Sequence, residues 1–221
     1  MNDRRNRKLR AGIAMLGVIA ALAGCRSSGD LVVDQGVGIT AIRTVCPATG
    51  IPNHTGNITT FRVPGNTTVE ALDVTASITN LRTTCNDVGD RVYSESTFDV
   101  QARRTDIRGA RTVELPYFAT VLRGGTAVVS KRVGTVTLNF ADGQERASTS
   151  AKAGTFITRS EATLPDDIRE RLTRRRKAGD PDAALDPLSE PEVRAAIARA
   201  TFELLIGFQL TEEQLAYNAT R

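Results

Sequence analysis

The chain of 221 residues carries 29 basic and 25 acidic side chains, for a formal charge of +4. Five of the basic residues and one acidic residue lie within the first 24 positions, so the following 197 residues carry 24 charges of each sign. A chain balanced in this way has no overall attraction for a polyanion, and we predict no nucleic-acid partner. One histidine and three cysteines are too few for a multi-histidine metal site or a cysteine-rich zinc cluster, and we predict neither a metal nor a cofactor.

The beginning of the chain has the layout of an export signal. Residues 1–10 contain five basic side chains, and residues 11–23 are apolar apart from two glycines. Thirteen helical residues span roughly 20 Å, which is short of the roughly 30 Å hydrocarbon core of a bilayer. This length predicts a cleavable signal peptide rather than a permanent transmembrane helix.

The apolar stretch ends in the four residues Leu22-Ala23-Gly24-Cys25. Together with the basic start, these residues resemble the lipobox of bacterial lipoproteins. The resemblance implies cleavage between Gly24 and Cys25, a diacylglycerol on the Cys25 sulfur and acylation of the new amino terminus. It covers residues 1–25 only, and the alternatives are an ordinary secretory signal or an uncleaved anchor.

A lipid on Cys25 makes the membrane the first predicted partner. Each buried methylene contributes about 0.8 kcal/mol, so several acyl chains on one cysteine anchor a protein stably without a spanning helix. The next residue is Arg26; in enterobacterial lipoproteins an aspartate at this place resembles an inner-membrane retention signal. We therefore predict the periplasmic face of the outer membrane, with the inner membrane as the alternative.

Export also determines the state of the other cysteines, because it places the mature chain in an oxidising compartment. Once Cys25 carries the lipid, Cys46 and Cys85 remain and allow a single pairing. We predict a Cys46–Cys85 disulfide, which closes a loop of about 39 residues and stabilises the fold by roughly 4 kcal/mol in the chain-entropy model. The alternatives are two separately buried thiols or one reactive thiol.

The middle of the chain, residues 58–157, alternates between apolar and polar side chains, which is the pattern of half-buried strands. Turn signals such as Gly124-Gly125 separate the stretches, and no helical repeat lies between them. This pattern predicts a mainly β fold, an antiparallel β-sandwich of the immunoglobulin or fibronectin type III kind, with a small barrel as the alternative. The predicted strands are 39–45, 58–63, 69–81, 91–104, 111–123, 126–140 and 145–157.

The composition changes after residue 160, where charged residues become dense. Asp166 is placed to cap a short helix that contains Ile168 and Leu172. Farther along, Ser189 with Glu192 and Thr211 with Gln214 form capping boxes that predict C-terminal helices. Val193, Ile197, Ala200, Leu204 and Phe208 follow one face of the first of these helices. The helices either cover the sandwich or bind an envelope protein.

These boundaries divide the chain into five parts. They are a signal peptide (1–24), a lipidated tether (25–38), a β-sandwich domain (39–160), a charged linker with a short helix (161–188) and the C-terminal helices (189–221).

The sequence shows no recognisable catalytic set. The single histidine, His54, lies in a loop rich in glycine and proline. Neither a G-x-S-x-G motif nor a phosphate-binding glycine loop before a helix is present. We therefore predict no catalytic residues.

Two arginine clusters could meet phosphate-bearing headgroups or an acidic partner, and the alternative is an ordinary solvated surface. The first cluster is Arg103, Arg104, Arg108 and Arg111, and the second is Arg174, Arg175 and Arg176.

Taken together, the sequence predicts a lipid-anchored envelope protein that acts as a non-enzymatic structural, binding or assembly module. The alternatives are a hydrolase of envelope polymers that uses carboxylates alone, and a carrier of a small ligand or lipid.

Overall fold

The structure, a computed structural model, describes residues 44–174, 179–181 and 185–220. The predicted signal peptide, the lipidation site Cys25 with its tether, and the basic residues Arg175 and Arg176 lie outside the described residues. The described strands are β1 (Ala48–Gly50), β2 (Asn57–Phe61), β3 (Leu72–Asn86), β4 (Arg91–Arg104), β5 (Arg111–Arg123), β6 (Ala127–Phe140), β7 (Arg146–Thr158) and β8 (Phe202–Phe208). The described helices are α2 (Arg159–Ala162), α3 (Asp166–Thr173), α4 (Pro191–Ala200) and α5 (Glu212–Ala219), with 3-10 turns η1 (Val69–Ala71) and η2 (Pro187–Ser189).

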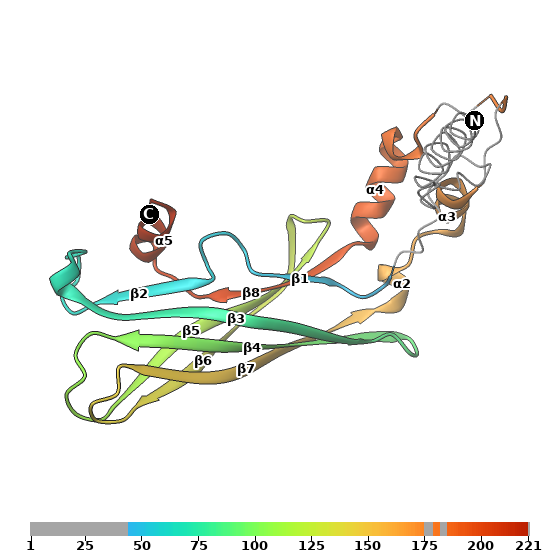
Figure 1. The fold of residues 1–221 in the computed structure, drawn as a ribbon. Helices are drawn as coiled ribbons and strands as arrows, with labels where there is room; N and C mark the ends of the chain where they lie inside the picture. Colours follow the sequence, from blue (N-terminus) through green and yellow to red (C-terminus); the bar gives the residue numbers. More distant parts are fainter. Residues whose placement is uncertain (1–43, 175–178, 182–184, 221) are drawn as a thin grey trace, which may run out of the picture.

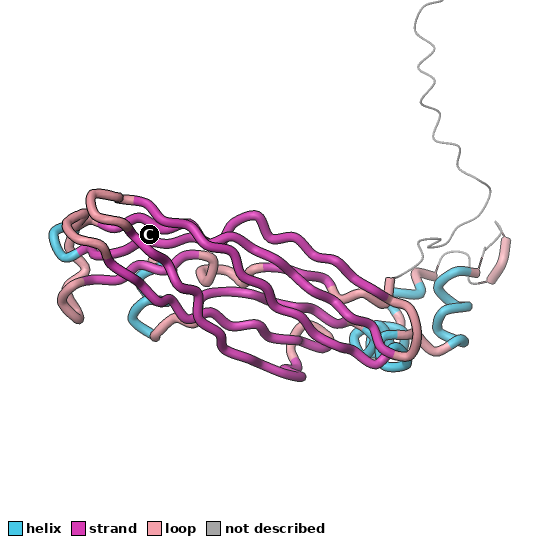
Figure 2. The backbone as a smooth tube through the Cα atoms, turned by 90° about the horizontal axis from the view of Figure 1, so that it is seen from below, coloured by secondary structure: helices cyan, strands magenta, loops and turns pink. Residues whose placement is uncertain are grey.

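The strands form two four-stranded sheets, in the orders β1-β8-β5-β6 and β2-β3-β4-β7. Neighbouring strands are antiparallel except for β1 and β8, which run parallel. The sheets make an elongated body with α2, α3 and α4 at one end (Figures 1 and 2), and α5 lies beside β2. The prediction of a mainly β, mostly antiparallel fold is confirmed.

Both sheets contribute to one hydrophobic core. Phe98 and Val100 of β4 belong to the same cluster as Leu138 and Phe140 of β6, and each of these four side chains is at most 2% exposed. Burying a side chain of this size contributes about 1.5–3 kcal/mol. The apolar sides of the two sheets therefore face each other, and the alternating polar residues of the long strands face outward.

The predicted strand boundaries hold best in the middle of the chain. β4 and β5 begin and end at the predicted residues. In β3, Val74, Ala76 and Ile78 are buried, as their alternation predicts. These strands are long and half-buried, so their pattern repeats often enough to be read from the sequence.

The first strand differs from its prediction. Thr44 and Val45 are not in a strand, and residues 39–43 lie outside the described part of the chain. The strand is β1, Ala48–Gly50, which lies in the glycine- and proline-rich stretch around His54 that was predicted to be a loop. It pairs in parallel with residues 203–205 of β8. Three residues are too few to show a periodic pattern.

The prediction of a helix through residues 201–208 is wrong. The helix α4 ends at Ala200, and the next residues form β8, which lies between β1 and β5. Phe202, Leu204 and Ile206 are each at most 5% exposed. The run is short and almost continuously apolar, so its residues fit a helical spacing and a strand spacing equally well. Hydrogen bonding to a strand on each side decides in favour of β8.

The strand β3 contains a bulge that changes which of its side chains face the core. Thr79 lies opposite Asp99 and Arg82 lies opposite Thr97, so Asn80 and Leu81 together face the single residue Phe98. Asn80 takes the left-handed conformation, with φ of 53°, as the first residue of a G1-type bulge does. Even-numbered residues of β3 face inward before the bulge, and odd-numbered residues face inward after it.

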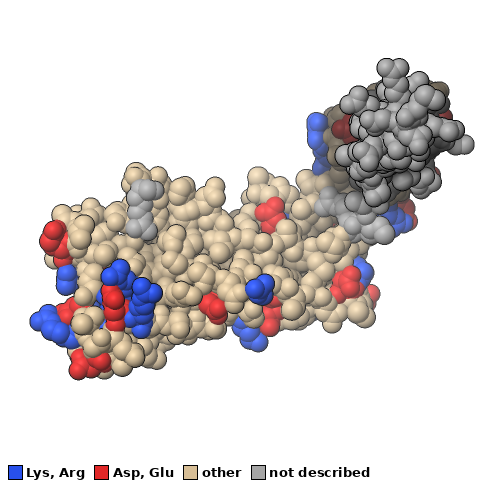
Figure 3. Space-filling view, in the orientation of Figure 1, with Lys and Arg blue, Asp and Glu red and all other residues tan. Residues whose placement is uncertain are grey.

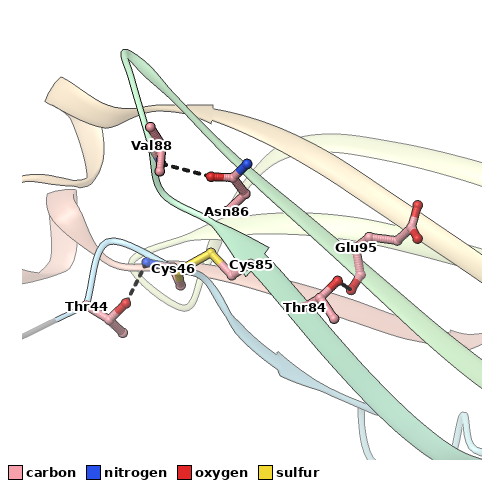
Figure 4. The surroundings of a disulfide bond; sticks show 7 residues. All are labelled: Thr44, Cys46, Thr84, Cys85, Asn86, Val88 and Glu95. Carbon is pink, nitrogen blue, oxygen red and sulfur yellow. Dashed lines mark hydrogen bonds between the residues drawn. A yellow bond between two sulfur atoms is a disulfide. The ribbon is translucent and has the colours of Figure 1, made fainter.

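The predicted disulfide between Cys46 and Cys85 is present, with an S–S distance of 2.04 Å (Figure 4). Cys85 lies opposite Ser94, which is fully buried, so Cys85 is on the inward face of its sheet. Cys46 precedes β1, a strand of the other sheet. The disulfide therefore connects the two sheets near the end that carries the helices.

Helices α3 and α4 form a small cluster at this end. Ile168 and Leu172 of α3 are buried, as predicted, and they share a cluster with Val193 and Ala196 of α4. Arg171 of α3 pairs with the acidic residues at the start of α4. The helices thus bury their own apolar faces against each other.

Two predicted helix starts differ in detail. Asp166 is the first residue of α3 rather than its cap. The capping box of Ser189 and Glu192 is absent, because α4 is preceded by Glu190 and begins at Pro191. A proline in the first helical turn loses no hydrogen bond, since that N–H has no partner within the helix.

The last helix, α5, begins at the predicted capping box, in which Thr211 and Gln214 bond to each other's backbone. Its Asn218 side chain donates hydrogen bonds of 2.8 Å to the carbonyl oxygens of His54 and Asn57. These bonds fasten the C-terminal helix to the loop before β2.

The bulge gives a testable prediction at Asn80. Alanine is strained in the left-handed conformation and glycine is not, so Asn80→Ala should lower the free energy of unfolding by about 1 kcal/mol more than Asn80→Gly. Both variants lose the hydrogen bond from Asn80 to Asp99, so the difference isolates the backbone conformation. Urea unfolding followed by circular dichroism measures it, and equal stability of the two variants would contradict the bulge.

Candidate functional site

In the structure, the first predicted basic cluster does not lie together on the surface, because Arg104 is only 1% exposed. Its guanidinium donates hydrogen bonds of 2.8–2.9 Å to the carbonyl oxygens of Ile107, Gly109, Ala141 and Gln144. These carbonyls belong to the β4–β5 and β6–β7 loops. The prediction of Arg104 as part of a surface patch is therefore wrong. Backbone carbonyl groups solvate its charge inside the protein, and Arg104 thereby connects the two loops.

The other members of this cluster each pair with a carboxylate. The pairs are Arg103 with Glu145, Arg108 with Asp106 at 2.6 Å, and Arg111 with Asp73 at 2.6 Å. The hydrogen bond from Arg108 holds the pKa of Asp106 well below its usual range, and the hydrogen bond to Asp73 raises the pKa of Arg111. Charged side chains of both signs gather at the end of the body that carries the β4–β5 and β6–β7 loops (Figure 3), so these four arginines do not form a uniform basic patch.

The second predicted cluster is largely outside the described residues. Arg174 follows α3 and is exposed, whereas Arg175 and Arg176 are not described. This cluster stays a prediction.

The outward face of the β2-β3-β4-β7 sheet is built from rows of polar side chains. Residues that lie opposite one another on neighbouring strands share a face of the sheet. One row holds Thr75, Arg103 and Arg146, and the next holds Ser77, Gln101 and Ser148. Alternation in three strands thus brings hydroxyl, amide and guanidinium groups together near the charged end.

These rows line an open groove of about 790 Å³. Its lining comes mainly from β3, β4 and β7, with one residue from β6 and one from the β6–β7 turn. The lining residues are Thr75, Ser77, Thr79, Gln101, Ala102, Arg103, Asn139, Gln144, Arg146, Ala147 and Ser148. Most of these side chains are hydrogen-bond donors or acceptors, so the groove suits a polar ligand.

The lining of the groove includes a pair of arginines. Arg103 lies directly opposite Arg146, and like charges in such positions destabilise a sheet. Glu145 pairs with Arg103, whereas Arg146 makes no ion pair with any described residue. Two guanidinium groups beside hydroxyls and amides form a donor set for an anion that carries hydroxyl groups of its own.

Two carboxylates lie farther along the same face, and each already has a partner. Hydrogen bonds from Ser150 and Asn80 lower the pKa of Asp99, and the hydrogen bond from Tyr93 lowers the pKa of Glu95. The Cα atoms of Glu95 and Asp99 are roughly 13 Å apart along β4. Both carboxylates are thus engaged in hydrogen bonds with neighbouring side chains of their own sheet.

His54 does not join a catalytic arrangement among the described residues. It sits in a turn with φ of 65°, its side chain is exposed, and its carbonyl accepts the hydrogen bond from Asn218. Its place in the fold is that of a turn residue.

Comparison with models of known protein families, with curated proteins and with solved structures finds no similar protein.

Within residues 44–174, 179–181 and 185–220, no helix has the length and apolar character needed to span a membrane. The same residues contain no group of three or more His, Cys, Asp or Glu side chains placed to hold a metal ion.

The sequence pattern predicted Arg103 as a basic surface residue but not Arg146, which lies opposite it on β7. The signal that could have found the groove is the alternation of Thr75, Ser77 and Gln101, which puts these polar residues on one face. The position of Arg146 opposite Arg103 depends on the pairing of β4 with β7, which the sequence pattern did not predict. These strands are separated in the chain by the β5–β6 hairpin, so local pattern does not reveal their register.

The buried arginine gives a prediction about stability. Arg104→Leu leaves four loop carbonyls without their donor, so it should lower the free energy of unfolding by about 3 kcal/mol or more. Arg103→Leu is the matched control, because its exposed ion pair contributes about 1 kcal/mol or less. Urea unfolding of both variants measures the difference, and a similar small loss for both would contradict the role of Arg104.

Proposed function

We propose that this protein is a lipid-anchored component of the bacterial cell envelope that binds an anionic, hydroxyl-rich polymer in the groove around Arg103 and Arg146. The observation that carries the proposal is this pair of opposed arginines within a groove of hydroxyl and amide groups. A charge-assisted hydrogen bond is about twice as strong as a neutral one, so the arginines supply affinity. The hydroxyl and amide groups supply contacts to neutral parts of the ligand.

The lipid anchor rests on the lipobox at Leu22-Ala23-Gly24-Cys25. The Cys46–Cys85 disulfide supports export, because disulfides persist in oxidising compartments such as the bacterial periplasm. We place the protein on the periplasmic face of the outer membrane because Arg26 follows the lipidated cysteine, with the inner membrane as the alternative.

The shape of the protein suits a tethered binding module. The described chain begins close to α2 (Figure 1). The groove instead includes Arg103 near the end of β4 and Arg146 at the start of β7, beside the β6–β7 turn. Ten residues of β3 separate Thr75 in the groove from Cys85 at the disulfide, which corresponds to roughly 33 Å. The groove therefore lies far from the place where the described chain begins.

We further propose that the two sheets form a sandwich of the layered kind found in immunoglobulin and fibronectin type III domains, with its own strand order. The common core supports the layering. In this chain β2, β3 and β4 are consecutive neighbours, whereas the immunoglobulin sheets have the orders ABED and CFG.

The other hypotheses have less support from the described residues. A carboxylate-dependent hydrolase needs two free carboxyl groups close together, and the Glu95 and Asp99 carboxylates of the outward face already accept hydrogen bonds from Tyr93 and Ser150. A lipid carrier needs an apolar cavity between the sheets, where the core side chains instead form one packed cluster.

The groove predicts binding of an acidic oligosaccharide. In the full chain purified in detergent, Arg146→Gln should weaken binding of a galacturonate oligomer about tenfold, because one charge-assisted hydrogen bond contributes about 1.5–3 kcal/mol. Arg82→Gln, an exposed arginine of the same sheet outside the groove, is the matched control. Isothermal titration calorimetry measures both variants.

The methyl-esterified oligomer is the ligand control, because it has the same hydroxyl groups and no charge. Equal binding of the ester and the acid, or no binding of the acid, would contradict the proposed ligand class.

The anchor gives a separate prediction. Cys25→Ala removes the sulfur that carries the lipid, so the protein should move from the membrane fraction to the soluble periplasmic fraction and keep its Cys46–Cys85 disulfide. Fractionation of cells with immunoblotting, together with non-reducing electrophoresis, measures both properties. An unchanged membrane fraction would contradict lipid anchoring at Cys25.

A further inference from the structure

The strand β6 has an open edge. It is the last strand of its sheet, and no other described strand pairs with its free side. Residues 127–133 are exposed throughout, whereas Val136, Leu138 and Phe140 in the second half of the strand are buried. An edge of this kind presents unpaired backbone N–H and C=O groups, to which an extended chain can add as a further strand.

The exposed half of β6 combines apolar and basic side chains. Val128, Val129 and Val133 are 63%, 56% and 58% exposed. Lys131 and Arg132 lie among them, and neither makes an ion pair with a described residue. Consecutive strand residues point to opposite faces, so one positive charge flanks the edge on each side.

Half of the eight basic residues in the other described strands behave differently. Arg103, Arg111, Arg123 and Lys152 each have a carboxylate partner. The ammonium of Lys131 lies instead 5.2 Å from the centre of the Phe118 ring. The edge of β6 therefore carries two charges that the described part of the protein does not neutralise.

We propose that the exposed half of β6 binds an extended acidic segment of another protein by strand addition. This interaction goes beyond the proposed polymer binding and uses residues outside the groove. Backbone hydrogen bonds supply affinity, and alternate side chains supply specificity. Acidic residues on both faces of the added strand complement Lys131 and Arg132, and apolar residues between them cover the exposed valines.

A second copy of this chain fits the edge less well. Antiparallel pairing of residues 127–133 with themselves centres on Ser130 and brings Lys131 close to the Lys131 of the other copy. Diagonal neighbours in such a pair are roughly 7–8 Å apart, and like charges at this distance repel. Lysine on an edge strand is a known means of preventing pairing between identical edges. The same charges attract an acidic strand.

The test uses the full chain in detergent and a capped nine-residue peptide of alternating glutamate and valine. We expect the peptide to bind and to slow amide hydrogen exchange in residues 127–133. The same peptide with alternate amides N-methylated should bind at least tenfold more weakly, because it lacks the backbone donors. Fluorescence anisotropy gives the affinities, and hydrogen exchange with mass spectrometry gives the location.

Charge reversal provides the matched variants. Lys131→Glu combined with Arg132→Glu should weaken binding of the acidic peptide at least tenfold and permit binding of a lysine–valine peptide. Arg82→Glu changes an exposed arginine of the other sheet and should leave both affinities unchanged.

Three results would overturn the inference. They are the absence of peptide binding, protection elsewhere than residues 127–133, and a concentration-dependent dimer of the unmodified protein that protects this edge. Each of them leaves the galacturonate test of the groove unaffected, so failure of one proposal is distinguishable from failure of the other.

Discussion

One extra residue in β3 determines which side chains face the core and which face solvent. Asn80 and Leu81 lie opposite a single residue of β4, so the alternation of β3 changes its sense between Thr79 and Arg82. A strictly regular strand would place Thr75 and Cys85 on the same face, because ten residues separate them. With the bulge, Thr75 faces outward into the groove and Cys85 faces inward toward the other sheet.

The groove and the disulfide lie on opposite sides of this bulge. The groove lies before the bulge, where two regular rows of polar residues reach Arg103 and Arg146. The disulfide lies after the bulge and connects the two sheets near the end where the described chain begins. At the other end, buried Arg104 connects two loops by solvating its charge with their carbonyl groups. The disulfide thus connects the two sheets at one end, and Arg104 connects two loops at the other. Between them, the exposed half of β6 keeps its outer edge unpaired among the described strands.

Much of this fold could be predicted from the sequence, because long half-buried strands repeat their pattern many times. The bounds of β4 and β5 and the pairing of the two described cysteines follow from local pattern and counting. The rest depends on contacts between distant residues. The short apolar run of β8 fits helix or strand until its neighbours are known, and the charge of Arg104 gives no sign that loop carbonyls will enclose it. The opposition of Arg103 and Arg146 likewise depends on a pairing between strands that are separated by a hairpin.

The register after the bulge is the most direct test of this account. Cross-strand nuclear Overhauser effects in the oxidised protein, labelled with nitrogen-15 and carbon-13, report which residues of β3 and β4 lie opposite each other. The bulge predicts contacts between Thr84 and Glu95 and between Arg82 and Thr97, together with Thr79 opposite Asp99. Contacts of Thr84 with Ser94 as its opposite residue, with Thr79 still opposite Asp99, would mean a regular strand. That result would contradict the inward position of Cys85.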